Sequence, residues 1–162
     1  MSTQTPAPAP HRENTIPGAL IYEYTARFTD VTSYGIALAD VFAGVIAPPP
    51  EGLRSDVGFE GPVSGPALRG TVTGVDYGNL RADGRAELHI HACISTEDGK
   101  NIALAADGVA TVENGSPVAQ LRENVTLTTS EPSYAWLNPL QIWATGTADF
   151  AAGEIHVTAY AA

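Results

Sequence analysis

The chain has 162 residues, with 8 Lys and Arg residues against 18 Asp and Glu residues and a formal net charge of −10. This length suits one domain, in which roughly 70% of the unfolded surface is buried on folding. The acidic balance argues against nucleic acid as a partner, because binding to phosphates requires clustered Lys and Arg side chains. The single cysteine, Cys93, excludes an intrachain disulfide and a thiolate metal cluster, and we expect it to be a small core filler.

The first 17 residues, MSTQTPAPAPHRENTIP, contain alternating Pro and Ala, which favours an extended segment without packing. They hold no apolar run of the ~7–15 residues that a secretory signal requires, and no later stretch approaches the ~20 apolar residues of a membrane helix. We therefore expect a soluble, cytoplasmic protein without a membrane partner. Residues 1–17 are expected to form a disordered tail, and residues 18–162 a single domain.

Period-two patterning with β-branched or aromatic residues predicts a series of short strands. Helix and strand compete at 34–46, and 47–66 is so rich in Pro and Gly that we expect a long loop near one mouth of the fold. The predicted strands are 19–29, 67–75, 85–95, 101–106, 118–128, 140–149 and 154–160. The dipeptides that favour tight turns at hairpin spacing are Asp83-Gly84, Asp98-Gly99, Asp107-Gly108 and Asn114-Gly115.

Many short strands joined by tight turns indicate an all-β fold. Their meander order favours a small closed up-and-down antiparallel barrel, lipocalin-like or allene-oxide-cyclase-like, because closure removes the exposed edges of an open sheet. A barrel of about eight strands is either filled by its own side chains or holds one small ligand. The expected partner is therefore a small apolar ligand or substrate.

The strand expected at 85–95 has two chemically different faces. Apolar residues occupy the even positions from 86 to 94, whereas the odd positions include Glu87, His89 and His91, and alternate side chains point to opposite faces of a sheet. In one interpretation the apolar set forms the core and the histidines face solvent. In the other, the lumen is polar and a partner subunit or a loop covers the apolar face. Trp143 lies on the polar face of a strand with the same division, whose small residues suit close packing.

His89 and His91 form an H-x-H pair, and this spacing on a strand lets both imidazoles reach one metal ion. The pair resembles the first half of the cupin signature, but the acidic residue comes late, at Glu97, and the downstream part is missing. Acid/base use and solvated histidines are the alternatives. We expect no metal and no cofactor.

Asp76 ends a predicted strand on the same face as Leu68 and Val72, which places its carboxylate at the interior mouth. A carboxylate among apolar neighbours loses solvation, so its pKa rises and it becomes a usable acid or base near neutral pH. Arg81 can neutralise that carboxylate or bind a ligand's oxyanion. The structural alternatives are a loop cap or ion pair for Asp76 and a surface ion pair for Arg81.

Three motifs in register resemble the family catalogued as domain of unknown function 3237: GTVTGVDYGNLRADGRAEL at 70–88, STEDGKNIAL at 95–104 and YAWLN at 134–138. The opening segment IYEYTARF and the closing segment IHVTAYAA extend the resemblance over nearly everything after the tail. The resemblance implies a small β-barrel that self-associates, here expected to be a homodimer, and it implies no settled activity. The residues that match the family's pattern are Asp76, Arg81, Asp83, Gly84, Asp98, Gly99, Tyr134, Trp136 and Asn138.

The chain also departs from that pattern. His89 and His91 stand where the resemblance implies an aspartate and an arginine, and Val109 stands close to the place of an expected arginine. If these positions line a pocket, the ligand or the chemistry of this chain differs from that of its relatives.

The segment 134–138 carries Tyr134, Trp136 and Asn138 on one side and is followed by a proline. The two aromatic residues can form a pocket wall, with the tyrosine hydroxyl as a proton donor. The alternative is a plug of the barrel whose polar atoms are satisfied internally.

Our first hypothesis is a cofactor-free isomerase, cyclase or lyase that uses acid/base groups on a small apolar carbonyl-, enol- or epoxide-bearing molecule inside the barrel. The alternatives are a non-catalytic binding or carrier barrel, a metal-dependent H-x-H enzyme, and a structural protein with a filled barrel. The predicted catalytic residues are Asp76, His89, His91, Arg81 and Tyr134. The predicted substrate-binding residues are Tyr24, Trp136, Asn138 and Trp143.

Overall fold

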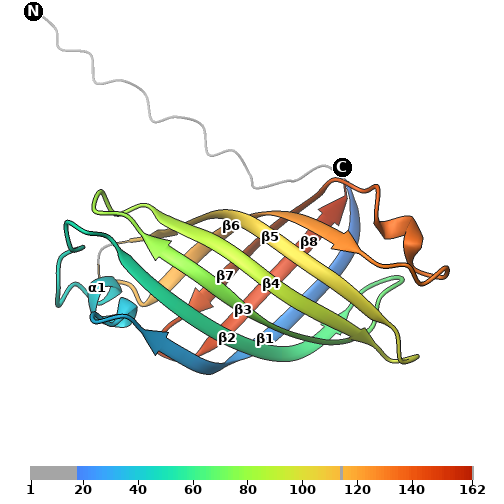
Figure 1. The fold of residues 1–162 in the computed structure, drawn as a ribbon, viewed down its shortest axis with the longest axis horizontal. Coiled ribbons are helices and arrows are strands. Elements are labelled where there is room, and N and C mark those ends of the chain that lie inside the picture. Colours follow the sequence, from blue (N-terminus) through green and yellow to red (C-terminus); the bar gives the residue numbers. More distant parts are fainter. Residues whose placement is uncertain (1–17, 114, 162) are drawn as a thin grey trace, which may run out of the picture.

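The computed structural model describes residues 18–113 and 115–161, which form one closed antiparallel barrel (Figure 1). The predicted all-β barrel of about eight strands is therefore confirmed. The disordered tail expected at 1–17 lies outside the described residues. The elements are β1 (Ala19–Ser33), α1 (Leu38–Phe42), β2 (Leu53–Ser64), β3 (Gly70–Leu80), β4 (Ala86–Thr96), β5 (Asn101–Val112), β6 (Val118–Thr128), η1 (Ala135–Leu137), β7 (Ile142–Asp149) and β8 (Glu154–Ala161).

Each strand pairs with the next one along the chain, and β8 returns to β1 to close the barrel. Tyr24 in β1, for example, lies opposite Val63 of β2 on one side and opposite Val157 of β8 on the other. Tight turns make this order possible, and Gly84 and Gly99 have the positive φ values, 89° and 81°, that such turns require. The meander expected from the turn dipeptides at 83–84 and 98–99 is thus present.

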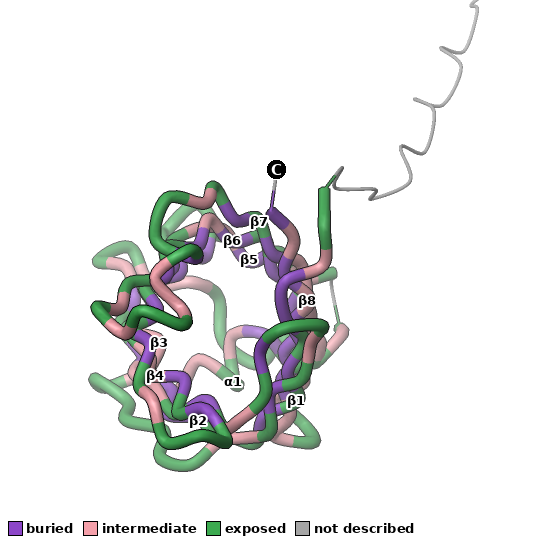
Figure 2. The backbone as a smooth tube through the Cα atoms, turned by 90° about the vertical axis from the view of Figure 1, so that its right-hand side faces the viewer, coloured by how far each residue is buried: buried purple, intermediate pink, exposed green. Residues whose placement is uncertain are grey.

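Alternate residues of every strand face the lumen, as β4 shows. Leu88, Ile90 and Ile94 are buried, whereas His89 and His91 are exposed on the outer wall. The interpretation with an apolar core and solvated histidines is therefore the one the structure shows. Figure 2 presents the barrel end-on, as a ring of strands with α1 lying across the far end.

The two ends of the barrel differ. At the end near η1, large side chains fill the interior, and Leu137, Ile142, Ile102 and Ile94 have no exposed surface. At the other end α1 covers the opening, and the interior side chains of the neighbouring strand ends include many alanines. The segment 34–46, for which the sequence allowed a helix or a strand, contains a short helix at Leu38–Phe42.

Two predictions about Gly- and Pro-rich sequence are wrong. The segment 47–66 is not a long loop, because β2 occupies 53–64 of it. Its Gly61 packs so closely on β1 that a Cβ would lie 2.0 Å from the Thr25 carbonyl oxygen. The dipeptide Asp107-Gly108 is not a turn but lies inside β5, where a Cβ on Gly108 would meet the Arg122 carbonyl oxygen of β6 at 1.9 Å. In both places glycine allows close approach of strands rather than a reversal.

Cys93 does not fill the core, which corrects a further prediction. Its position in β4 has the outward parity of His89 and His91, and its Sγ lies 3.8 Å from the Ser95 hydroxyl on the same wall. The side chain is half-buried. In the described part of the chain, no helix is both long enough and apolar enough to span a bilayer.

Candidate active site

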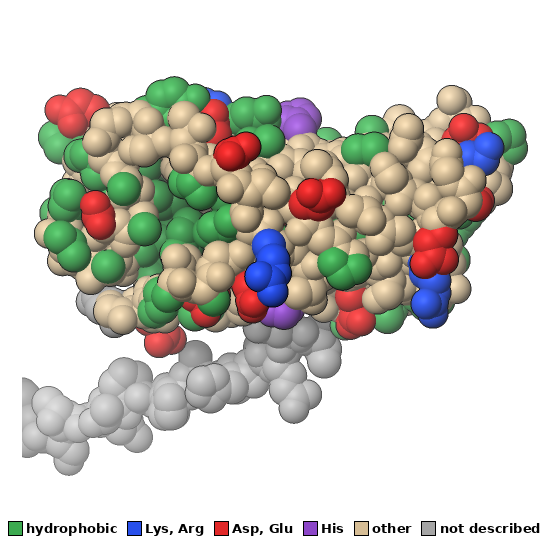
Figure 3. All heavy atoms as spheres, turned by 90° about the horizontal axis from the view of Figure 1, so that it is seen from below, with side chains coloured by type: hydrophobic (Ala, Val, Ile, Leu, Met, Phe, Trp, Pro, Cys, Tyr) green, Lys and Arg blue, Asp and Glu red, His purple; other side chains and the backbone are tan. Residues whose placement is uncertain are grey.

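A cavity occupies the α1 end of the barrel, and its walls are almost wholly apolar. Phe28 and Phe42 both contact Phe150 edge-to-face, with ring centroids 5.2 and 5.0 Å apart, and these three rings form its mouth. Figure 3 shows hydrophobic side chains gathered toward this end of the molecule. The cavity volume is about 60 Å³, several times the ~10–15 Å³ that one water needs but below the ~150 Å³ of an apolar cavity that binds benzene. The enclosed space therefore suits one end of a small organic molecule, with the remainder toward the α1 end of the barrel.

Small side chains create this space. Ala110 of β5, Ala119 of β6 and Ala148 of β7 point inward where larger residues would fill the lumen. On the opposite wall Gly78 adds no side chain at all beside Ser55. Of the small inward residues of β7 only Ala148 lines the cavity, whereas Gly146 packs tightly on β8, where a Cβ would lie 2.0 Å from the His156 carbonyl oxygen, as expected from the sequence.

Asp76 of β3 lines the cavity, as its strand parity predicted. The pairing of β3 with β4 is interrupted between Asp76 and Asn79, and there the Asp76 Oδ1 accepts a hydrogen bond of 2.9 Å from the His89 backbone N–H. Burial raises the pKa of the Asp76 carboxyl to about 6, and the hydrogen bond from His89 opposes that rise. Near neutral pH this carboxyl is mostly ionised and is basic enough to accept a proton.

Glu123 of β6 is the second acidic group in the cavity, and it was not among the residues predicted from the sequence. Only 3% of the residue is exposed, and its Oε2 has no hydrogen-bond partner among the described residues. Burial and, to a smaller extent, the charge of Asp76 together raise the pKa of the Glu123 carboxyl to about 8. Its inward parity, shared with Leu121 and Val125, was the sequence signal that could have identified it.

Two tyrosines of β1 extend this polar cluster. Tyr24 lines the cavity, and its ring stacks at 6.0 Å on Tyr22 and on Phe59. Burial raises the pKa of both tyrosine hydroxyls, and the negative charge of Glu123 adds to the rise for each. For Tyr24 the charge of Asp76 also contributes. Tyr24 therefore lies within electrostatic reach of both carboxyl groups.

The cavity thus combines a base, an acid and neutral hydrogen-bond donors in an apolar enclosure. Two carboxyl groups whose environments separate their pKa values can play opposite roles at one pH. With values of about 6 and about 8, Asp76 is the ionised partner and Glu123 the protonated one near neutrality. The arrangement can take one proton from a ligand and supply another.

The structure does not bring the other predicted catalytic residues to this cavity. His89 and His91 project from the outer wall, where the His91 ring lies 6.1 Å from that of Tyr77. Arg81 follows β3, is 55% exposed, and pairs with Asp83 at 2.8 Å and with Glu87 at 3.8 Å. It therefore makes the surface ion pairs of the structural alternative rather than an ion pair with Asp76.

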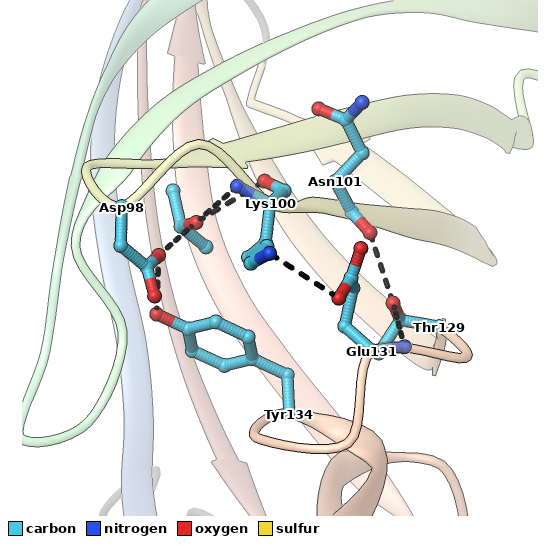
Figure 4. Close-up of polar contacts among 7 residues, drawn as sticks. Asp98, Lys100, Asn101, Thr129, Glu131 and Tyr134 are labelled. Atoms are coloured by element: carbon cyan, nitrogen blue, oxygen red, sulfur yellow. Dashed lines mark hydrogen bonds and ion pairs between the residues drawn. The ribbon is translucent and has the colours of Figure 1, made fainter.

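The predicted residues of segment 134–138 lie at the opposite end of the barrel, around η1. The Tyr134 hydroxyl donates a 2.8 Å hydrogen bond to Asp98, which also accepts one from the Thr96 hydroxyl (Figure 4). These hydrogen bonds, first from Thr96 and then from Tyr134, lower the pKa of Asp98. Asn138 donates to the Thr129 carbonyl oxygen at 2.7 Å and accepts from the Thr129 N–H at 2.9 Å.

Two predicted ligand-binding tryptophans lie outside the cavity walls. Trp136 in η1 is 46% exposed, and Trp143 on the outer wall of β7 is 43% exposed. Of the predicted site residues, the structure brings together only Asp76 and Tyr24 at the cavity. Within the described ranges, no group of three or more His, Cys, Asp or Glu side chains is arranged to hold a metal ion.

Fold and site together define a class: a small closed β-barrel with a one-ended apolar cavity that encloses paired carboxyl groups. More particularly, the chain belongs to the family described as "Protein of unknown function (DUF3237)", whose sequence model matches residues 45–162. This match confirms the resemblance noted in the sequence. Asp76 and Glu123 fall inside the matched region, whereas Tyr24 precedes it. No curated protein matches the chain.

Solved structures of similar fold come from several organisms. A conserved protein of unknown function from Rhodopseudomonas palustris is 22% identical, with a TM-score of 0.70 over 93% of this chain and 100% of the other. A protein of unknown function from Clostridium acetobutylicum is 21% identical, with a TM-score of 0.70 over 88% and 95%. An enzyme from Penicillium herquei is 21% identical, with a TM-score of 0.52 over 91% and 99%. At these identities the likeness shows a shared fold.

Proposed function

We propose that this barrel is a cofactor-independent acid/base enzyme, an isomerase, cyclase or lyase, acting on a small apolar molecule that carries a carbonyl or enol group. The observation that carries the proposal is that Asp76 and Glu123 line one apolar cavity and have pKa values near 6 and near 8. The fold similarity to an enzyme from Penicillium herquei is compatible with catalysis in such a barrel.

The simplest reaction is enolisation followed by return of the proton. The Asp76 carboxylate removes a proton from the carbon next to the carbonyl, and the protonated Glu123 carboxyl gives its proton to the carbonyl oxygen, which yields a neutral enol. From a simple ketone Asp76 returns the proton to the same carbon, and from a β,γ-unsaturated carbonyl it returns the proton to the γ-carbon of the dienol, while Glu123 recovers the enol proton, so that both groups end as they began. Cyclisation and elimination need the same pair, because each takes one proton and gives one.

Burial is what makes the acid effective. A carboxyl group kept neutral at pH 7 by an apolar site can donate a strong hydrogen bond to a developing oxyanion. The Tyr24 hydroxyl, whose pKa is raised chiefly by burial, remains protonated and can provide a second donor. In the enclosed cavity these donors do not compete with bulk water, which strengthens their effect on the developing charge.

The test is hydrogen–deuterium exchange at the carbon next to the carbonyl of simple ketones such as acetophenone, followed by NMR in D₂O. We expect exchange above the buffer rate, lowered ~10²–10⁴-fold by Asp76→Asn because the base is lost. Glu123→Gln retains an N–H donor, so we expect a smaller loss of ~10-fold or more. Asp107→Asn on the outer wall of β5 is the matched control, and exchange that survives Asp76→Asn contradicts the proposal.

The predominantly apolar wall of the cavity favours a second candidate, a binding or carrier barrel without turnover. In that case ketones would raise the melting temperature of the protein without any exchange above the buffer rate. Catalytic roles for His89, His91, Arg81 and Tyr134 stay predictions, to be tested by the same exchange assay. The homodimer expected from the family resemblance also stays a prediction, testable by sedimentation.

A further inference from the structure

We propose that the cavity takes an uncharged ligand bearing a hydroxyl group as well as its carbonyl, and that it rejects organic anions such as carboxylates and phosphate esters. This inference rests on the proposed site and names its substrate class. It follows from the signs of the charges and the unpartnered polar atoms around the cavity.

The charged side chains that line the cavity are acidic, and Arg54 and His89, whose charges lower the pKa of Asp76, lie outside its walls. No Lys, Arg or His side chain of the described chain lines it, while Asp76 and Glu123 lie inside and Glu87 lies at the mouth. Arg81, the cationic side chain that pairs with Glu87, is more than half exposed and is engaged on the outside. An anionic ligand would therefore leave water for an apolar site without a cationic side chain on its walls, which strongly disfavours its binding.

Two buried polar atoms of the lumen can form hydrogen bonds with a ligand. The Ser55 hydroxyl and the Glu123 Oε2 both line the cavity, are at most 3% exposed, and have no hydrogen-bond partner among the described residues. Buried polar atoms are nearly always hydrogen-bonded, so a ligand that supplies the missing partners is strongly favoured.

The two carboxyl groups require opposite partners. The protonated Glu123 needs an acceptor, which a carbonyl oxygen provides, whereas the ionised Asp76 needs a donor, which a hydroxyl group provides. The Asp76 Oδ2 lies on the cavity side, about 3.5 Å from the position that a Cβ on Gly78 would take, while Oδ1 is already engaged by His89. Glycine at position 78 leaves the approach to Oδ2 open.

The remainder of the ligand is apolar and aromatic or similarly flat. Between the carboxyl groups and the opening, the walls are formed by alanine and leucine side chains and then by the rings of Phe28, Phe42 and Phe150. Such walls bind aromatic rings through edge-to-face contacts without further hydrogen bonds. The polar end of the ligand is therefore expected to enter first.

The test compares three aryl methyl ketones that differ only in the group at ring position 3, by isothermal titration at pH 7: 3-hydroxyacetophenone, acetophenone and 3-acetylbenzoate. We expect the hydroxy ketone to bind about fivefold or more tightly than acetophenone, since one added hydrogen bond contributes ~1 kcal/mol. The carboxylate should bind at least ~100-fold more weakly than the hydroxy ketone, because its charge is buried unpaired. The double variant Asp76→Asn/Glu123→Gln should lower the ratio of the affinities for the hydroxy ketone and the carboxylate at least tenfold. The control Asp107→Asn should leave this ratio unchanged.

Comparable affinity for the carboxylate and the hydroxy ketone in the unmodified protein overturns the inference, as does an unchanged gap in the double variant. Failure of 3-hydroxyacetophenone to bind at millimolar concentration also overturns it. The proposed enzymatic function fails differently, because the hydroxy ketone then binds but no ketone exchanges its C–H hydrogen in D₂O.

Discussion

Glu123 occupies an inward position of β6 because its neighbours of the same parity, Leu121 and Val125, are buried in the core. An ionised carboxylate at such a place, with Oε2 unpartnered, would lose its solvation without compensation. The protonated form avoids most of this cost, which is the physical reason for a pKa of about 8. The folded protein therefore holds a proton on Glu123 at pH values where the unfolded chain has released it.

This difference predicts a pH dependence of stability. Between the ordinary glutamate pKa of 4.5 and about 8, the folded state binds more protons at Glu123, so the free energy of unfolding falls as pH rises, by at most about 1.4 kcal/mol per pH unit. Asp76 acts in the same direction between 3.8 and about 6. We expect the Glu123→Gln variant to lose the fall in the free energy of unfolding that occurs above pH 6. At pH 9 this variant should therefore be more stable than the unmodified protein.

Urea unfolding at several pH values measures this slope. Glu60→Gln is the matched control, because Glu60 is exposed on β2 and its replacement should leave the curve parallel to that of the unmodified protein. A Glu123→Gln variant that retains the full slope above pH 6 would show that Glu123 is ionised in the folded barrel.

The connection between β6 and β7 works as an element that closes one end of the barrel. Leu137 of η1 is completely buried against the core, and Asn138 makes two hydrogen bonds with the backbone of Thr129. Tyr134 joins the same connection to the β4–β5 turn through Asp98, and Lys100 pairs with Glu131 at 3.6 Å (Figure 4). The polar contacts hold the apolar plug in place at the end opposite the cavity.

For Tyr134 we therefore expect a role in stability. Tyr134→Phe removes the hydrogen bond to Asp98 and should lower the melting temperature by a few degrees. Ketone exchange should stay within about twofold of the unmodified rate, because Tyr134 does not line the cavity. Trp136→Phe, at an exposed position of η1, is the control for both measurements. A loss of exchange comparable to that of Asp76→Asn would instead assign Tyr134 to the reaction.

Sequence patterns predicted most elements, and the exceptions share one cause. The alternation of apolar residues located β1 and β3 to β8, and it gave the inward face of β4 at Leu88 and Ile90. Strand β2 was missed because Gly58, Gly61 and Pro62 have the composition of a loop. In the barrel these glycines face close neighbouring backbone, a requirement of curvature that a single sequence does not display.

At the scale of the whole molecule, closure decides which side chains meet. Asp76 on β3 and Glu123 on β6 belong to strands that are not neighbours, and they face one cavity because the sheet curls into a ring. Strand parity indicated that Asp76 points inward, but it does not give the level of each residue along the barrel axis. That level depends on the stagger of all eight strands, so the pairing of the two carboxyl groups was beyond sequence reasoning.

Closure also predicts how the amides of the first and last strands exchange with solvent. In an open sheet β1 and β8 would be edges, whereas here Tyr24 of β1 is paired with β2 on one side and β8 on the other. We expect the amides of β1 and β8 that point toward either neighbouring strand to be as strongly protected in hydrogen exchange, followed by NMR, as those of β4 and β5. The amides of Ala82 and Asp83 in the β3–β4 turn, which donate no hydrogen bond to the backbone of the described residues, should exchange rapidly and serve as the reference. Amide exchange more than about 100-fold faster in β8 than in β5 would mean that the pairing between β1 and β8 opens locally. Ala148 and Ile155 form the cavity wall beside this pairing. Water would then enter the cavity, and burial could no longer keep Glu123 protonated.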